Sequence, residues 1–244
     1  MGEALLLETS NLGKTFGGVE AVRNIDFSLA EGELRCLIGP NGAGKSTFFK
    51  LLTGQIEPNQ GSVRYRGRDI TGWASSQISR LGVGIKMQVP SVFEGLDVRE
   101  NLRLSARRKH DRRRVGELVD ETLARLEIGA LASTRVSHLS HGQRALVELG
   151  IVLAGKPDLL LLDEPTAGMT GEEVARTAEL IRDINRTSAL IVVEHDMNFI
   201  KMIARRVTVF HQGAILIEDT MDRLLRNPQV RDIYLGRQAE VPNA

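Results

Sequence analysis

The sequence predicts an α/β fold in which a core of strands and helices carries a small antiparallel β-region and an inserted helical region. Short apolar runs typical of strands buried on both faces occur in both halves of the chain. Residues from about 91 to 156 carry helical periodicity instead. The length of 244 residues supports one domain with a sizeable core, or a core with a subdomain.

The first buried strand is expected at residues 34–38, and a glycine-rich loop follows it. Residues 39–46 fit the pattern G-x-x-x-x-G-K-[ST], whose glycines let the backbone turn and point its N–H groups inward. A helix predicted from about Lys45 adds the positive end of its dipole. We therefore expect Lys45 to reach the β- and γ-phosphates of a nucleotide and Ser46 to bind Mg²⁺. The predicted nucleotide-binding residues here are Gly39, Pro40, Asn41, Gly42, Ala43, Gly44, Lys45, Ser46 and Thr47.

Three helix starts and one apolar stripe are predicted further along the chain. Capping boxes are expected at Asp97 to Glu100 and at Ser140 to Gln143, and Thr170 with Glu173 suggests another helix start. The Ser140 start, with the small Gly142 beside it, is compatible both with a simple cap and with an anion site. A hairpin turn is expected at residues 61–65, and a late hairpin joins 207–210 to 214–217. The stripe comprises Val115, Leu118, Val119, Thr122, Leu123 and Leu126.

A second chemical cluster follows the leucine run at residues 159–162, which predicts a strand buried on both faces. Asp163, at the tip of this strand, suits a Mg²⁺ ligand, bound directly or through water. Glu164 projects one residue further, and we assign it as the catalytic carboxylate that polarises the attacking water. His195 follows another apolar run and is expected at the same level of strand ends.

These motifs, in this order, resemble the ATP-binding subunits of ATP-binding cassette (ABC) transporters, from the first strand to about Arg237. The resemblance makes residues 39–46 the Walker A loop, 139–143 the signature motif and 159–164 the Walker B strand. It implies a RecA-like P-loop ATPase core with a small antiparallel β-subdomain and an inserted α-helical subdomain. We expect one ABC ATPase domain at 1–239, with the core and β-subdomain at about 1–90 and 157–239, the helical subdomain at about 91–156 and a tail at 240–244.

The resemblance also gives roles to residues that carry little information alone. Gln88 matches the Q-loop glutamine, a catalytic and metal-binding position that links the γ-phosphate site to a membrane subunit. His195 matches the switch histidine, which contacts the γ-phosphate and is counted as catalytic. Phe16 lies where the family usually has an aromatic side chain that stacks on adenine. Ser140, Gly142 and Gln143 would cover the γ-phosphate bound to a second chain, which implies a dimer that closes on ATP.

The sequence departs from the usual family pattern at Phe16, where tyrosine is more frequent, and at two further places. His141 replaces the second residue of the signature, which is usually glycine, while Ser140 and Gly142 are intact. Residues 166–170 lack the common Leu-Asp, so contacts across the dimer there are expected to differ.

Composition limits the partners and the location. The net charge is +1, and the basic run at 107–114 contains no aromatic residue for base stacking, so no nucleic acid is expected. We interpret this run as a solvated loop between helices. The single cysteine, Cys36, suits a reducing compartment, and no apolar run approaches the ~20 residues of a membrane-spanning helix. The resemblance implies a peripheral protein at the cytoplasmic face of the inner membrane, bound to permease subunits.

The resemblance narrows the transported substrate to a group. The motifs after Leu139 and the ending Ile233 to Arg237 resemble bacterial importers of branched-chain amino acids, urea and short amides, with a modest preference for urea. Such importers imply a second ATPase subunit, identical or paralogous, and a periplasmic binding protein that acts indirectly. A lipopolysaccharide exporter and a soluble ABC ATPase of iron–sulfur cluster assembly are the alternatives.

Overall fold

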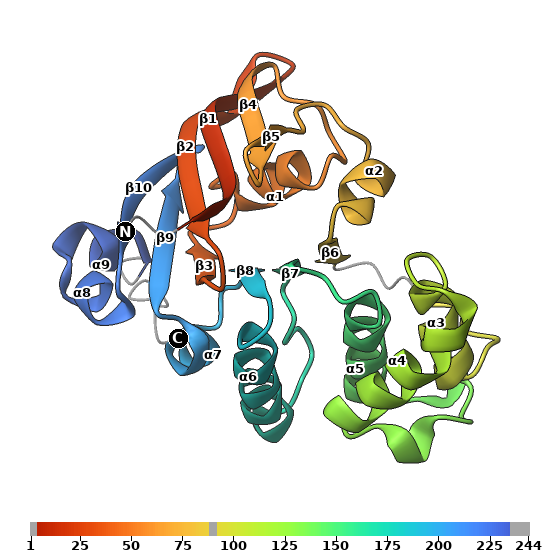
Figure 1. Ribbon diagram of the computed structural model, residues 1–244. Coiled ribbons are helices and arrows are strands. Elements are labelled where there is room, and N and C mark those ends of the chain that lie inside the picture. The colour runs from red at the N-terminus through yellow and green to blue at the C-terminus, as the bar shows by residue number, and fades with distance from the viewer. Residues whose placement is uncertain (1–3, 88–91, 235–244) are drawn as a thin grey trace.

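The computed structural model describes residues 4–87 and 92–234, and these form two sheets with helices packed around them (Figure 1). The larger sheet has the strand order β10-β9-β3-β8-β7-β6. Neighbouring strands run parallel except for β10, which pairs antiparallel with β9 in the predicted late hairpin. Its strands are β3 (Leu34–Ile38), β6 (Val83–Lys86), β7 (Leu159–Asp163), β8 (Ala189–Val193), β9 (Arg206–His211) and β10 (Ala214–Asp219).

The smaller sheet is antiparallel and has the order β2-β1-β4-β5. The hairpin turn predicted at residues 61–65 is wrong, because this segment forms β4, with Val63 and Tyr65 buried at alternate positions. The chain turns instead at Arg66 and Gly67, whose φ angles are 50° and 73°. Its strands are β1 (Leu5–Phe16), β2 (Val19–Ala30), β4 (Gln60–Tyr65) and β5 (Arg68–Asp69).

The helices of the described ranges fall into separate groups in Figure 1, with α3, α4 and α5 lying apart from the others. None of them is long and apolar enough to cross a membrane. Short 3₁₀ turns at Gly129–Leu131 and Val136–His138 connect α4 to α5. The helices are α1 (Lys45–Leu52), α2 (Ser75–Arg80), α3 (Val98–Ala106), α4 (Arg112–Arg125), α5 (His141–Leu153), α6 (Gly171–Asn185), α7 (Met197–Ile203), α8 (Met221–Arg226) and α9 (Pro228–Tyr234).

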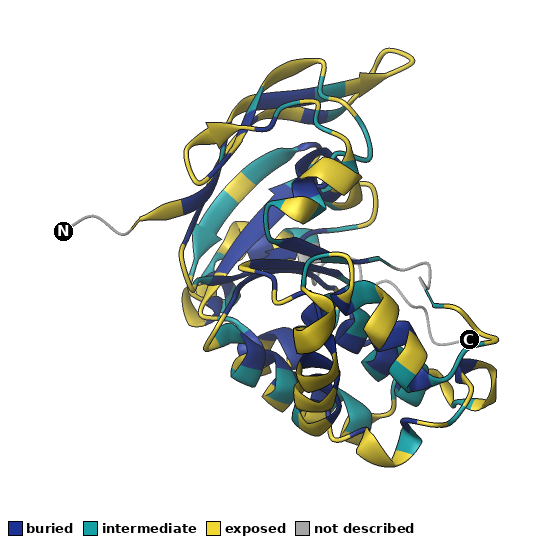
Figure 2. Cartoon of the chain, turned by 45° about the vertical axis from the view of Figure 1, so that its right-hand side comes forward, coloured by how far each residue is buried: buried dark blue, intermediate teal, exposed yellow. Residues whose placement is uncertain are grey.

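Both faces of the larger sheet are covered, which explains why its inner strands β7 and β8 consist almost wholly of apolar residues (Figure 2). Leu159 and Leu161 of β7 pack with α1 and the antiparallel sheet in one hydrophobic cluster. Leu160 and Leu162 pack with α5, α6 and α7 in a second cluster on the opposite face. The predicted α/β class, with its antiparallel β-region and helical group, is therefore confirmed.

The helical group begins and packs as its sequence indicates. The side chains of Asp97, Ser140 and Thr170 are the N-caps of α3, α5 and α6, and each closes a capping box. All six residues of the stripe predicted for α4 and its C-terminal end are buried. Burial of this stripe against α3 and α5 holds the group together.

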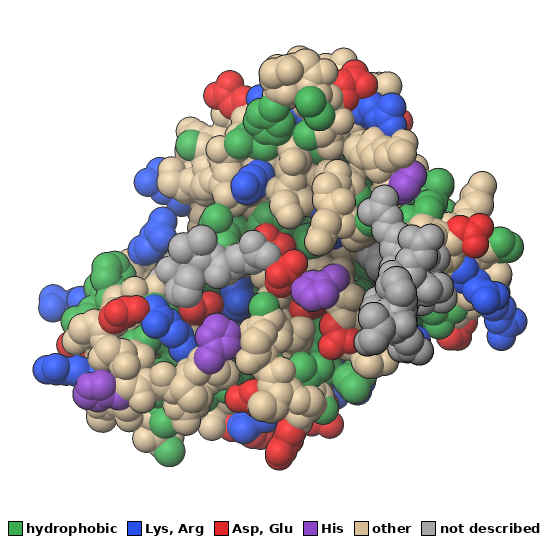
Figure 3. Space-filling model, turned by 180° about the vertical axis from the view of Figure 1, so that it is seen from behind, with side chains coloured by type: hydrophobic (Ala, Val, Ile, Leu, Met, Phe, Trp, Pro, Cys, Tyr) green, Lys and Arg blue, Asp and Glu red, His purple; other side chains and the backbone are tan. Residues whose placement is uncertain are grey.

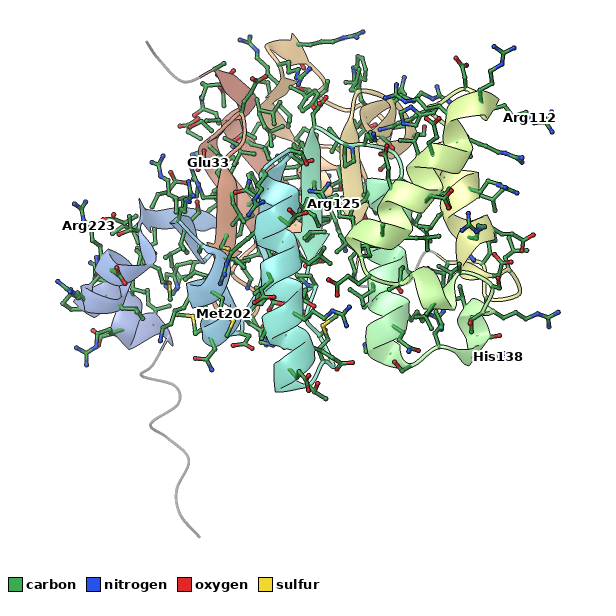
Figure 4. All side chains as sticks on the ribbon, turned by 60° about the horizontal axis from the view of Figure 1, so that its bottom comes forward. Glu33, Arg112, Arg125, His138, Met202 and Arg223 are labelled. Atoms are coloured by element: carbon green, nitrogen blue, oxygen red, sulfur yellow. The ribbon has the colours of Figure 1, made fainter. Side chains whose placement is uncertain are left out.

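Polar contacts help to attach the helical group to the core. Arg125, at the end of α4, donates to Asp183 of α6 through Nε at 2.7 Å and to its backbone carbonyl through Nη2 at 2.9 Å. Figure 4 shows Arg125 between these two helices. Lys86 of β6 lies 3.5 Å from Glu148 of α5, and both side chains are about nine-tenths buried. The position of α5 relative to the sheet is therefore set by charge pairs as well as by apolar packing.

Candidate nucleotide-binding and catalytic site

The loop at residues 39–44 joins β3 to α1, as predicted for a phosphate-binding loop. Gly39 and Gly44 have φ angles of 154° and 102°. A Cβ atom at Gly39 would lie 2.4 Å from the carbonyl oxygen of Phe210, and one at Gly44 would lie 2.5 Å from that of Ala21. Only glycine fits at both positions, so the loop can pack closely against β2 and β9.

Lys45 begins α1, and its side chain folds back over the loop. The ammonium group donates to the carbonyl oxygens of Gly39 at 2.6 Å and Pro40 at 3.0 Å. Burial lowers the pKa of Lys45, and the charges of Glu164 and Asp163 oppose this change. The loop lysine and the two carboxylates from the end of β7 are therefore close enough to interact, although 118 or more residues separate them in sequence.

Asp163, the last residue of β7, holds a buried oxygen that nothing in the described ranges satisfies. Its Oδ1 is fully buried and has no hydrogen-bond partner there. Burial raises the pKa of Asp163, with a further contribution from Glu164, whereas Lys50, Lys86 and Lys45 lower it. An orphaned carboxylate oxygen near the loop lysine fits an oxygen ligand of a divalent cation.

Glu164 and His195 come from the ends of β7 and β8 and meet at the surface. The Nδ1 atom of His195 lies 3.4 Å from Oε1 of Glu164. Glu164 adopts φ 46°, an uncommon conformation for a non-glycine residue, and its N–H donates to Val193 at 2.9 Å. Acidic and histidine side chains gather in the middle of the face seen in Figure 3. A water molecule beside Glu164 could therefore lose a proton to the Glu164 carboxylate, which His195 helps to position.

Glu194 is the functional candidate that the sequence analysis did not single out. Its side chain is 1% exposed and accepts from both the N–H and the hydroxyl of Thr166, in the loop after Glu164. It also accepts from the N–H groups of His195 at 2.9 Å and Asp196 at 3.3 Å. Glu194 thus joins the loop of Glu164 to the loop of His195. The sequence feature that indicates Glu194 is its position directly after the fully buried strand β8.

Ser140, Gly142 and Gln143 lie in the first turn of α5, on the other side of the sheet from the phosphate loop. The α1 residues that follow Lys45 pack in the hydrophobic cluster on one sheet face, and the α5 residues pack in the cluster on the opposite face. Ser140 Oγ accepts from the N–H of Gln143, and the Gln143 side chain returns a bond to the N–H of Ser140. The structure therefore groups Lys45, Asp163, Glu164 and His195 and keeps Ser140 on a separate element.

The remaining predicted residues stand as follows. Phe16 ends β1 with its side chain 48% exposed and the ammonium of Lys14 5.2 Å from its ring centroid. Its role in adenine stacking stays a prediction. Gln88 lies outside the described residues. A cavity of about 310 Å³ borders the site and is lined by Glu164, Pro165 and Ala167 together with Lys86, His141, Arg144, Ala145 and Glu148.

Comparison with known proteins places these features in a family. The ABC transporter family model matches residues 22–167. The high-affinity branched-chain amino acid transport ATP-binding protein LivG of Salmonella typhimurium is 34% identical, covering 95% of this chain and 98% of LivG. The lipopolysaccharide export system ATP-binding protein LptB of Acidithiobacillus ferridurans is 32% identical, covering 97% of this chain and 99% of LptB.

A solved structure points to the same family as both relatives. The ADP conformation of MJ1267, an ATP-binding cassette of an ABC transporter, matches with a TM-score of 0.85 and 26% identity, covering 95% of this chain and 99% of that chain. Family model, relatives and structure cover the phosphate loop, the helical group and the carboxylates at the end of β7 alike. The chain therefore belongs to the ABC transporter family, as an ATP-binding subunit that hydrolyses ATP.

Proposed function

We propose that this ATPase powers an importer of branched-chain amino acids. The observation that carries the proposal is the similarity to LivG, which extends over 95% of this chain and 98% of LivG. LivG is by its name a branched-chain amino acid transport protein. The preference for urea among the small amides stays a prediction.

Binding of ATP is the first step assigned to the site. The amides of residues 39–46 and the ammonium group of Lys45 hold the phosphates, and Phe16 stacks on the adenine. The orphaned Oδ1 of Asp163 and the hydroxyl of Ser46 would hold Mg²⁺, with Gln88 as a further ligand. When bound, this ion neutralises charge on the β- and γ-phosphates. Binding also relieves the unfavourable burial of Lys45, whose ammonium otherwise bonds only to its own loop in the described structure.

Hydrolysis then requires one proton acceptor and one well-placed water. Water attacks the γ-phosphorus. The bond between the γ-phosphorus and the β,γ-bridging oxygen breaks, and ADP leaves with the electron pair of that bond. Glu164 accepts the proton from the water, while the His195 imidazole, 3.4 Å from Glu164 Oε1, orients that carboxylate and contacts the γ-phosphate. Glu194 keeps the two loops in register through its four accepted bonds.

The site is completed by a second chain. Ser140, Gly142 and Gln143 lie at the start of α5, on the sheet face opposite α1, so they are well placed to meet a different chain. In this dimer they cover the γ-phosphate bound to the partner, and ATP stabilises the closed state over the open one. The partner is a second copy or a paralogous ATPase.

A membrane-spanning permease subunit is the proposed partner of a large groove beside the helical group. The groove has a volume of about 840 Å³ and is lined by residues of α2, β6, α3 and α5, including Met87 and Val92 on either side of the Gln88 segment. Phe93, 61% exposed, and Leu104, 40% exposed, supply apolar contacts within it. The chain would then bind peripherally at the cytoplasmic face of the inner membrane, with a periplasmic binding protein delivering substrate to the permease.

An uptake assay in the host of this protein tests the proposal. Deletion of the gene should abolish high-affinity uptake of radiolabelled leucine, and the wild-type gene should restore it. The matched control is Glu164→Gln, because an amide accepts no proton. This variant should still bind ATP, but its hydrolysis rate should be lower by about 10²–10⁴-fold. Unchanged leucine uptake in the deletion strain would contradict the proposal. Loss of urea uptake alone would assign urea, and accumulation of lipopolysaccharide in the inner membrane would assign the exporter function suggested by LptB.

A further inference from the structure

The side chain of His141 turns toward the loop that follows β7. His141 is the first residue of α5, and its Nε2 lies 3.1 Å from the carbonyl oxygen of Ala167. Because a carbonyl oxygen only accepts hydrogen bonds, this contact requires a hydrogen on Nε2. Neutral imidazole with that tautomer and imidazolium both satisfy the requirement, so the bond does not depend on charge.

Two glycines allow α5 and this loop to approach closely. A Cβ atom at Gly168, whose φ is 72°, would lie 3.0 Å from Nε2 of His141, so the imidazole packs directly on the loop backbone. A Cβ atom at Gly142 would lie 2.1 Å from the Glu173 carboxylate. That carboxylate accepts from the N–H of Thr170 at 2.8 Å and so stays at the end of the loop. Consecutive residues of α5 therefore contact both the middle and the end of the loop.

The same loop begins at the catalytic carboxylate. The N–H of Ala167 donates to the carbonyl oxygen of Glu164 at 3.3 Å. His141 and Glu164 also line one cavity of about 310 Å³. A displacement of α5 would thus reach the Glu164 backbone through Ala167, by way of His141.

We propose that His141 is a positioning residue that holds the loop at 165–170 against α5. It thereby links the α5 segment that serves the partner's nucleotide to the carboxylate that serves this chain's own nucleotide. This inference rests on the proposed sharing of each site between two chains. Within one chain, α5 closes over the partner's ATP and Glu164 aligns the water that attacks this chain's own ATP. His141 then couples these two movements.

The contact is tested with three variants of the full-length protein. His141→Ala removes the donor, and His141→Gln replaces it with an amide N–H of similar reach. His138→Ala is the matched control, because His138 is exposed three residues earlier and its label in Figure 4 lies at the outer end of the helical group. The measurements are backbone hydrogen exchange at residues 165–170 and the ATP dependence of hydrolysis.

His141→Ala should speed exchange at residues 165–170 and lower kcat, each by about two- to tenfold, the range expected for one lost hydrogen bond. KM for ATP should stay within about twofold, because the variant keeps the phosphate loop intact. Cooperativity in ATP should fall. His141→Gln should recover most of the wild-type values, and His138→Ala should match the wild type throughout.

The proposal is overturned if His141→Ala and His138→Ala give the same exchange and the same kcat. It is equally overturned if His141→Gln is as impaired as His141→Ala, or if only KM changes. Failure of site sharing gives a different result: the wild type itself would show no cooperativity, although His141→Ala would still speed exchange in the loop. The two ideas are therefore distinguished by the wild-type curve.

Discussion

Burial disfavours the charged forms of two residues of the site, Asp163 and Lys45. Burial raises the pKa of Asp163 and lowers the pKa of Lys45, even though the charges of these residues attract one another. Both groups would be stabilised in their charged forms by a nucleotide phosphate and its counter-ion. The same burial that lowers the stability of the ligand-free chain should therefore favour binding of Mg-ATP, a compromise that is common at functional sites.

Asp163→Asn should stabilise the ligand-free protein at neutral pH. Because the folded pKa of Asp163 is raised, its favourable burial in the protonated form is fully present below the unfolded value of 3.8 and is lost as pH rises through the folded pKa. The variant cannot ionise, so its Tm should exceed that of the wild type at pH 7 and the difference should shrink toward pH 4. Each kcal/mol corresponds to about 2–4 °C for a chain of this length. Differential scanning calorimetry at several pH values checks this, and an equal or lower Tm at pH 7 would contradict it. With Mg-ATP added, the variant should gain less Tm than the wild type.

At the scale of the elements, strand pairing places the catalytic candidates at one edge of the sheet, and contacts between the loops that follow the strands complete their alignment. β7 and β8 pair in parallel, so Glu164 and His195 leave the sheet at the same edge. The final alignment comes from Glu194, whose buried carboxylate bonds to Thr166 on one side and to His195 and Asp196 on the other.

Glu194→Ala should destabilise the fold and impair hydrolysis together. The change leaves the buried N–H group of Thr166 and the part-buried N–H groups of His195 and Asp196 without their acceptor, and a buried unsatisfied group costs about 1–3 kcal/mol. Urea unfolding should show a loss of at least ~2 kcal/mol, with a lower kcat at temperatures where the variant is folded. Glu194→Gln keeps one acceptor oxygen and serves as the control, with a smaller loss expected. Equal stability of Glu194→Ala and the wild type would show that these bonds contribute little.

At the scale of the whole molecule, the proposed sharing of each nucleotide site between two chains can be tested through dimerisation. Ser140→Arg places a bulky cation at the start of α5, which packs on the sheet face opposite α1. The variant should bind ATP about normally but fail to dimerise on ATP and fail to hydrolyse it. Sedimentation with ATP and a phosphate-release assay provide the measurements. A monomeric Ser140→Arg protein with full ATPase activity would refute shared sites.

Mixing variants sharpens this test. Lys45→Ala should weaken ATP binding by roughly 1.5–3 kcal/mol, since it removes a charge-assisted contact to phosphate. A mixed dimer of Ser140→Arg and Lys45→Ala chains has one site with both defects and one with neither. ATPase activity should partly return in the mixture if one intact site is enough for turnover, and isothermal titration of each variant alone confirms which function it lacks.

Local sequence determined the elements that build the site. The glycines at 39, 42 and 44 with Lys45 define the phosphate loop, and the capping boxes at Asp97, Ser140 and Thr170 begin three helices as predicted. The leucine run before Asp163 predicts a strand covered on both sides, and both sheet faces are indeed packed. These features were readable because capping, turn geometry and two-sided burial each leave a pattern within a few neighbouring residues.

Only the tertiary structure decided which of these segments meet. It brings Glu194 into contact with Thr166, 28 residues away, and it places His141 against Ala167, 26 residues away. It also assigned residues 61–65 to a strand, because pairing of β4 with β1 overrides a local turn signal. Such contacts depend on strand order and on the approach of backbones where Gly142 and Gly168 leave room. No local pattern encodes them, because the free energy that selects them comes from packing between distant segments rather than from the residues of either segment alone.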